Sequence, residues 1–235
     1  MKIAMWSGPR NLSTAMMYSF GNRADCAVVD EPFYAAYLHH SGVDHPMRAQ
    51  ILQSQTTDPA VVARNMLGPN PGGQAIWYQK HMTHHMMAGF PMDWLADVVN
   101  VFLIRHPARV IASYHRKREN PTMDDLGFAA QKRLYDHCVA LGQTPAVIDS
   151  DDILVDPERA LTGLCARIGI SFDPAMLTWP SGPRADDGIW AAHWYDAVHR
   201  STGFGGPVGA LPRVESGGAI YRESLNIYDG FREKC

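Results

Sequence analysis

The stretch Ile3-Ala4-Met5-Trp6-Ser7-Gly8-Pro9-Arg10-Asn11-Leu12-Ser13-Thr14 joins a short apolar run to a glycine-proline turn that presents an arginine and two hydroxyls. A strand, a tight turn and a helix leave unpaired backbone N–H groups aimed at one point, with the helix dipole behind them. Arg10 adds a planar cation that can bind two oxygens of an oxyanion at once. The turn therefore predicts an anion site; the alternative is a capped helix start beside a solvent-facing arginine.

The same turn differs from the loop that binds nucleoside triphosphates. That loop reads GxxxxGK[ST], and its lysine reaches the β- and γ-phosphates. Counted from Gly8, Ser13 stands at the second glycine position and Thr14 at the lysine position. The turn thus favours phosphate or sulfate, but not a triphosphate.

Short apolar runs alternate with helical patterns along the chain. Strands are expected at 3–6, 26–29, 75–78, 98–104 and 146–148, and helices near 11–21, 46–55, 58–67, 107–118, 124–141 and 157–168. Thr122 with Asp125 resembles a capping box, and Asp156-Pro157-Glu158 is typical of a helix start. The alternation predicts an α/β fold with a parallel sheet covered on both faces, whose ligands lie beyond the carboxyl ends of the strands. We expect one domain over 1–235, with irregular loops from about residue 179.

Bulk composition excludes several classes of protein. The 235 residues are 46% hydrophobic and 19% charged with a formal net charge of −3, so no basic field favours nucleic acid or an anionic membrane. The four cysteines are far apart, which argues against a zinc knuckle or a disulfide framework. No apolar run reaches the roughly 18 residues that a membrane span needs, and the N-terminus does not read as a signal peptide. We expect a cytoplasmic protein.

A second turn has the same arrangement as the first, with a strand end, an arginine and a helix start. In Val101-Phe102-Leu103-Ile104-Arg105-His106-Pro107-Ala108-Arg109-Val110-Ile111-Ala112-Ser113-Tyr114 a strand ends in Arg105, and Pro107 sets the first helical position. Arg105 and the hydroxyl of Ser113 can converge on a second phosphate, although an ion pair beside a packed serine is the alternative. Two such corners in one sheet indicate a ligand with two separate anionic ends.

Three stretches resemble the P-loop sulfotransferases. Gly8 to Thr14 is similar to the loop that cradles the 5′-phosphosulfate, and Arg105 with Ser113 resembles the 3′-phosphate motif. The stretch from Asp149 to Ile170 resembles a third family motif. The resemblance implies a three-layer P-loop NTPase-like fold and the donor 3′-phosphoadenosine-5′-phosphosulfate. It implies that Pro9, Arg10, Asn11, Leu12, Ser13 and Thr14 bind the 5′ end, and that Arg105 and Ser113 bind the 3′-phosphate.

The chain also looks like a subgroup of small sulfotransferase-like proteins, related to a domain found beside branched-chain aminotransferase-like modules. Three positions depart from the family pattern. Leu12 stands where glycine is frequent, and His106 where Asp or Asn is usual. The loop Gly203-Phe204-Gly205-Gly206 only loosely resembles the glycine-rich loop of the family and lacks its lysine.

The segment Trp77-Tyr78-Gln79-Lys80-His81-Met82-Thr83-His84-His85 lies between the two corners in sequence. The resemblance implies that Lys80 stabilises charge on the bridging oxygen, with Arg10 assisting, and that a histidine accepts the proton of the acceptor. A histidine base suits neutral pH; His81 stands first because it adjoins Lys80, followed by His84 and His85. Two alternatives stay open: a metal site, if the three histidines share a helix face, or a surface cluster without a chemical role.

Further residues complete the prediction. Glu31 either contacts the acceptor, braces Arg10 or forms a buried ion pair. Trp190, His193, Trp194 and Tyr195 are expected in the core, with an acceptor pocket as the alternative. The sequence as a whole predicts a sulfotransferase that acts on a hydroxyl of a small soluble acceptor without a metal. The rival interpretations are an ATP- and Mg²⁺-dependent phosphotransferase and a non-catalytic nucleotide-binding module.

Overall fold

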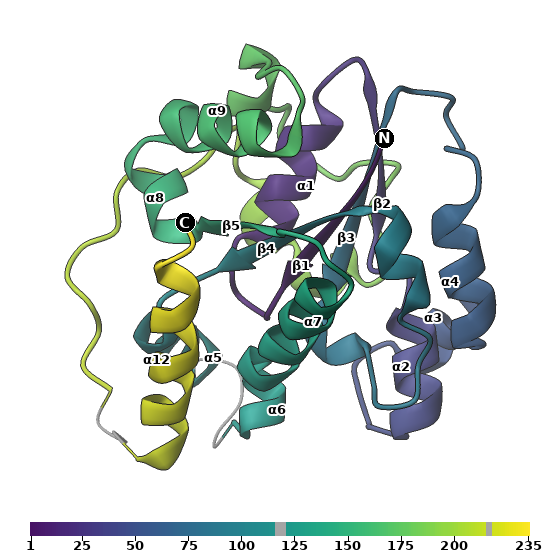
Figure 1. Ribbon diagram of the computed structural model, residues 1–235, viewed down its shortest axis with the longest axis horizontal. Helices are drawn as coiled ribbons and strands as arrows, with labels where there is room; N and C mark the ends of the chain where they lie inside the picture. Colours follow the sequence, from purple (N-terminus) through teal and green to yellow (C-terminus); the bar gives the residue numbers. More distant parts are fainter. Residues whose placement is uncertain (116–120, 215–217) are drawn as a thin grey trace.

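Five parallel strands form the centre of the computed structural model, which describes residues 1–115, 121–214 and 218–235 (Figure 1). The strands are β1 (Lys2–Ser7), β2 (Cys26–Asp30), β3 (Ile76–Met82), β4 (Val99–Ile104) and β5 (Ala146–Asp149). Their order across the sheet is β2-β3-β1-β4-β5, and every neighbouring pair is parallel. β1 is therefore flanked on both sides, and the turn that follows it leaves the middle of the sheet.

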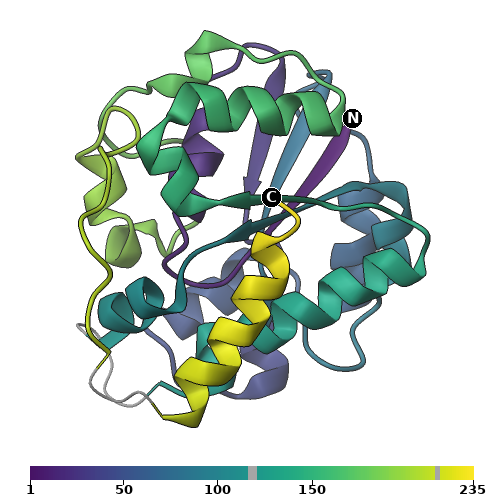
Figure 2. The ribbon, with the colours of Figure 1, turned by 60° about the vertical axis from the view of Figure 1, so that its left-hand side comes forward.

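Helices cover both faces of the sheet, as the alternating pattern predicts. The longer helices are α1 (Ser13–Gly21), α2 (Tyr34–Ser41), α3 (Arg48–Ser54), α4 (Pro59–Leu67), α5 (Pro107–His115), α7 (Phe128–Ala140), α9 (Pro157–Ile168) and α12 (Ala219–Arg232). The shorter ones are α6 (Met123–Leu126), α8 (Ser150–Val155), α10 (Ala191–Trp194) and α11 (Asp196–His199), with 3₁₀ turns η1 (Thr83–His85), η2 (Asp93–Asp97) and η3 (Pro174–Leu177). Figure 2 shows α9 on one side of the sheet and α7 with α12 on the other.

The two faces of β1 belong to two separate hydrophobic clusters. Ile3 and Met5 pack with α1, α2 and α9, whereas Ala4 and Trp6 pack with α4, α7 and α12. Side chains alternate along a strand, so an uninterrupted apolar run is what a strand buried on both faces requires. The α/β fold with a parallel sheet, expected from the sequence, is confirmed.

The structure differs from the sequence prediction at several boundaries. The helix expected at 124–141 is divided at Gly127, whose φ of 77° is left-handed, so that Thr122 and Asp125 cap the short helix α6. β3 continues to Met82, and two of its polar residues, Gln79 and Lys80, form hydrogen bonds inside the protein. Of the helix expected at 107–118, the structure describes α5 (Pro107–His115), and residues 116–118 lie outside the described ranges.

The largest difference is the region after residue 179, which was expected to be irregular. It contains α10, α11 and the 14-residue helix α12, which packs against α5, α7 and β5. The buried residues of α12, Ser224, Tyr228 and Phe231, are spaced by four and three positions, the helical period. Within the described residues, no helix has both the length and the apolar character needed to cross a membrane.

Candidate active site

The loop between β1 and α1 has a backbone shaped for an anion. Arg10 and Leu12 both adopt a left-handed conformation with φ of 64°. Backbones that alternate between right- and left-handed residues form concavities lined by N–H groups, which bind anions. A left-handed conformation costs a residue with a side chain about 1–2 kcal/mol, and such strain concentrates at functional sites. The conformation of Leu12 also explains why glycine suits this position.

The two predicted anion corners meet. β1 and β4 are neighbours, and Ser7 lies opposite Leu103, so the turns that follow them leave the sheet side by side. Arg105 Nη1 donates to the carbonyl oxygen of Arg10 at 2.6 Å, and Arg10 Nε donates to Ser113 Oγ at 3.0 Å. The structure thus brings together the arginines and the serine that the sequence assigned to separate phosphates.

Arg105 carries an unused donor. Its Nε is buried and has no hydrogen-bond partner among the described residues. Burial lowers the pKa of Arg105. The positive charges of Arg109 and Arg10 lower it further, and the carboxylate of Asp151 opposes the shift. A buried donor without a partner costs free energy that an anionic oxygen would recover. Arg109, by contrast, is occupied by an ion pair with Asp151 at 2.8 Å.

The third motif, which starts at Asp149, contacts both anion corners. Asp149 ends β5 and accepts a hydrogen bond from the backbone N–H of Asp151, in the first turn of α8. Ser150 is fully buried, and its hydroxyl lies 2.9 Å from the carbonyl oxygen of Asn11 and 2.7 Å from that of Ile104. One side chain therefore joins the first loop to the end of the strand that carries Arg105.

Both corners open into one cavity of about 900 Å³. Its walls include all eight residues predicted to bind the nucleotide: Pro9, Arg10, Asn11, Leu12, Ser13, Thr14, Arg105 and Ser113. Most of the remaining wall comes from Glu31, α2, the segment 43–46, Lys80, η1 and the segment 190–205, which brings in Gly203, Phe204 and Gly205. This volume lies near the upper end of the range of small-molecule sites, about 300–1,000 Å³.

Lys80 lines the cavity but lies at its base. Its Nζ donates to Asp30 Oδ1 at 2.8 Å, to Glu31 Oε1 at 2.5 Å and to Tyr195 Oη at 2.5 Å. Burial alone would lower the pKa of Lys80, but Asp30 and Glu31 raise it above its usual value. An ammonium group has three N–H donors, and all three are used here. In this arrangement Lys80 holds the carboxylates and has no donor left for a bridging oxygen.

His81 faces away from the cavity. It is the sixth residue of β3 and therefore points to the face opposite Lys80, where its ring stacks on Trp6 at 4.4 Å and contacts Phe33 and Trp94. Burial lowers the pKa of His81 to about 3. His81 does not line the cavity, so this geometry places the predicted base in the core.

His84 and His85 do line the cavity. Burial lowers the pKa of His84 to about 4, and His45 lowers it further. Burial also holds the pKa of His85 well below its usual value, with further contributions from His84 and His45. The Nδ1 atoms of both rings are buried without a hydrogen-bond partner in the described part of the chain. His85 Nδ1 lies 3.9 Å from Glu31 Oε2. A neutral imidazole beside a carboxylate is a suitable proton acceptor.

The structure overturns the alternative in which the three histidines share a helix face. His81 belongs to β3, whereas His84 and His85 belong to the 3₁₀ turn η1, so the three do not share one face. Within residues 1–115, 121–214 and 218–235, no group of three or more His, Cys, Asp or Glu residues is placed to hold a metal ion. The carboxylate that approaches the pair, Glu31, comes from the end of β2.

Comparisons with known proteins identify the family of the chain. The model of the family described as "Sulfotransferase domain" matches residues 1–235. The chain belongs to the sulfotransferase domain family. In overall fold, the domain is similar to the "Sulfotransferase Domain from the Synechococcus PCC 7002 Olefin Synthase", with a TM-score of 0.53, 17% identity and coverage of 99% of this chain and 94% of that one. The "Sulfotransferase Domain from the Curacin Biosynthetic Pathway" matches with the same TM-score at 15% identity, covering 99% and 90%.

The sulfotransferase domain is also similar to two curated proteins of Arabidopsis thaliana. "Branched-chain-amino-acid aminotransferase-like protein 1" is 38% identical over 205 residues, which are 87% of this chain and 37% of that protein. "Branched-chain-amino-acid aminotransferase-like protein 2" is 36% identical over 205 residues, 87% of this chain and 36% of that protein. The sulfotransferase domain thus spans little more than a third of the length of these relatives.

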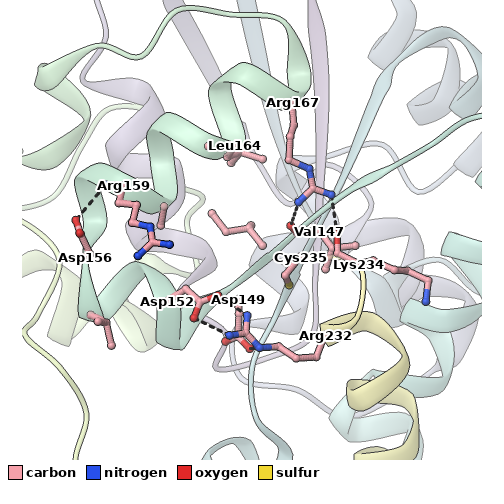
Figure 3. A pocket seen from close by; sticks show the side chains of 14 residues that line it. Val147, Asp149, Asp152, Asp156, Arg159, Leu164, Arg167, Arg232, Lys234 and Cys235 are labelled. Carbon is pink, nitrogen blue, oxygen red and sulfur yellow. Dashed lines mark hydrogen bonds and ion pairs between the residues drawn. The ribbon is translucent and has the colours of Figure 1, made fainter.

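A second cavity of about 510 Å³ lies between α8, α9 and the end of α12 (Figure 3). Several of its charged groups have partners within the protein. Arg232 pairs with Asp152, and Arg167 donates to the carbonyl oxygens of Val147 and Lys234 (Figure 3). None of the predicted site residues of the sulfotransferase domain lines this cavity.

Gly127 supports the anion loop by close contact. A Cβ atom at Gly127 would lie 3.0 Å from Thr83 Oγ1 and 3.3 Å from Gly8 Cα. We expect Gly127→Ala to lower the free energy of unfolding by about 2–3 kcal/mol, because strained backbone and a steric clash add. Gly142→Ala is the matched control, since φ there is 81° and nothing lies within 4 Å; we expect about 1 kcal/mol. Urea denaturation measures both, and equal losses would contradict the contact argument.

Proposed function

We propose that this sulfotransferase domain transfers the sulfuryl group of 3′-phosphoadenosine-5′-phosphosulfate to a hydroxyl of a small acceptor. The observation that carries the proposal is the unpartnered, buried Nε of Arg105 beside Arg10 and Ser113 in one cavity. Two adjacent cationic corners fit a nucleotide with phosphate groups at both its 3′ and 5′ ends. The missing P-loop lysine argues against a triphosphate donor.

The residues of the first loop would hold the 5′ end of the donor. The left-handed backbone around Arg10 and Leu12 supplies N–H groups, and Ser13 and Thr14 supply hydroxyls in the first turn of α1. Arg105 and Ser113 would hold the 3′-phosphate. The donor supplies an activated sulfuryl group, so the protein needs only to position both substrates, stabilise charge and remove one proton.

His85 is the group we assign to the proton of the acceptor. It lines the cavity, its depressed pKa keeps it neutral at pH 7, and Glu31 lies beside it. A proton taken up by the ring would be stabilised by the Glu31 carboxylate. Lys80 then acts indirectly, because its ion pair fixes Glu31. This assignment replaces His81, whose ring packs in the core.

Titration with adenosine 3′,5′-bisphosphate in the absence of magnesium tests the proposal. The wild-type domain should bind, and Arg105→Ala should weaken binding about 10- to 100-fold, because hydrogen bonds to charged groups contribute about 1.5–3 kcal/mol. Arg64→Ala, which removes an exposed arginine from α4, is the control and should bind as the wild type does. Equal affinity for Arg105→Ala would overturn the assignment of the second corner. A response to ATP that requires magnesium would favour a phosphotransferase instead.

A further inference from the structure

The half of the cavity away from the anion corners is walled by aromatic rings. Tyr37 stacks on His85 at 4.8 Å between ring centroids, and His85 stacks on Tyr34 at 4.5 Å. The series continues from Tyr34 to His45 at 5.6 Å and from His45 to Trp194 at 5.5 Å. All five residues line the cavity. We call this series the aromatic wall.

The charges near the aromatic wall are negative. Glu31 and the exposed Asp44 line the cavity there. Lys80 is shared between two carboxylates, Asp30 and Glu31, so the buried cluster carries one more carboxylate than it has cations. Apart from Lys80, the only lysine or arginine side chains that line the cavity within the described ranges are those of Arg10 and Arg105, which belong to the anion corners.

Two of the histidines that line the cavity, His84 and His85, do not change this balance. Burial lowers the pKa values of His84 and His85, so both rings are neutral at pH 7. Each also keeps a buried Nδ1 without a partner in the described part of the chain. A neutral imidazole has one acceptor nitrogen, so these rings suit a ligand that brings a hydrogen-bond donor, such as a hydroxyl or an ammonium group.

We propose that the acceptor is an amino alcohol, which carries a positively charged nitrogen in addition to the hydroxyl that receives the sulfuryl group. Aromatic faces attract cations, and a carboxylate at the buried end compensates a charge that leaves water. In the transfer, the hydroxyl oxygen forms a bond to sulfur while the bond from sulfur to the phosphate oxygen of the donor breaks. The hydroxyl proton passes to His85, and adenosine 3′,5′-bisphosphate leaves. This inference rests on the proposed function.

Binding of three matched alcohols tests the inference. The probes are choline, its uncharged tert-butyl analogue, in which carbon replaces the quaternary nitrogen, and glycolate as an anionic alcohol. Calorimetric titration of the domain saturated with adenosine 3′,5′-bisphosphate should show choline binding about tenfold or more tighter than the neutral analogue. Glycolate should bind weakest. Equal or tighter binding of the neutral analogue would overturn the inference.

Variants of the aromatic wall separate the cation from simple apolar contact. Tyr37→Phe keeps a ring and should retain the preference for choline over the neutral analogue, whereas Tyr37→Leu should reduce that preference several-fold. Asp44→Asn, at an exposed position, should also reduce it. Thermal unfolding checks that each variant is folded. An unchanged preference in both Tyr37→Leu and Asp44→Asn would count against a cation site.

The same titrations distinguish this inference from the proposed function. Binding of adenosine 3′,5′-bisphosphate without discrimination among the alcohols would overturn the amino-alcohol inference and leave the donor assignment intact. The alcohols are also titrated without nucleotide, so that the preference for a cation is decided even if the bisphosphate does not bind. A domain that prefers choline but does not bind the bisphosphate would overturn the proposed donor.

Discussion

Replacement of Lys80 by methionine should lower the free energy of unfolding by about 3–5 kcal/mol. Removing one partner of a buried ion pair leaves an uncompensated charge, which costs about that much. Here the side chain of Lys80 is 1% exposed and faces two carboxylates that would be left without it. Methionine retains the length of the side chain and removes the ammonium group. Urea denaturation followed by circular dichroism measures the loss.

Lys132→Met is the matched control for this experiment. Lys132 also pairs with an aspartate, Asp136, but the two side chains are 56% and 57% exposed. Exposed pairs contribute about 0–1 kcal/mol, so the control should lose little stability. The double variant Lys80→Met with Glu31→Gln should recover part of the loss, because it removes one of the unpaired charges. If Lys80→Met were as stable as Lys132→Met, Lys80 would not be an anchor of the carboxylates.

His85→Gln should lower kcat by about 10²–10⁴, the usual contribution of a general base. Its affinity for adenosine 3′,5′-bisphosphate should not change, because His85 lies on the acceptor side of the cavity. Because the pKa of His85 is lowered by burial, the ring stays deprotonated as pH falls below 6.5. The wild-type rate should therefore remain level through that range and fall only at more acidic pH, when His85 gains its proton.

His84→Gln is the comparison for the same assay. His84 lines the cavity as well, but the ring that approaches Glu31 is that of His85. A much smaller loss of kcat is expected for His84→Gln. If instead His84→Gln lost the activity and His85→Gln kept it, the proton would be assigned to the wrong ring of η1.

The two anion corners were predictable because each is a local pattern: a strand end, an arginine and a helix start. Their meeting followed from the parallel sheet, which places all strand ends at one edge. The orientation of His81 was not predicted, because β3 was expected to stop at Tyr78. The alternation from Trp77 through Gln79 to His81 was a usable signal: each second residue returns to the same face, so His81 shares the face of Trp77 rather than that of Lys80.

Contacts between distant segments could not be found in the sequence. Lys80 meets Asp30, 50 residues earlier, and Tyr195, 115 residues later, so no local spacing reveals that its donors are used. Glu31 was expected to touch the acceptor, brace Arg10 or form a buried ion pair; the structure shows the ion pair, at the wall of the cavity. Trp190 and Tyr195 are buried, as a core interpretation expects, whereas His193 is exposed and Trp194 half-buried. All four line the cavity.

The bond network of Ser150 has a consequence for ligand choice. Since the buried hydroxyl of Ser150 lies within hydrogen-bond distance of the carbonyl oxygens of Asn11 and Ile104, contacts inside the protein rather than the ligand set the separation of the two corners. The fixed distance between the two anion corners selects ligands by length: a nucleotide whose two phosphate groups are separated by that distance can bind both corners at once. A nucleotide with a single phosphate, such as adenosine 5′-monophosphate, can bind only one anion corner and leaves the other solvated.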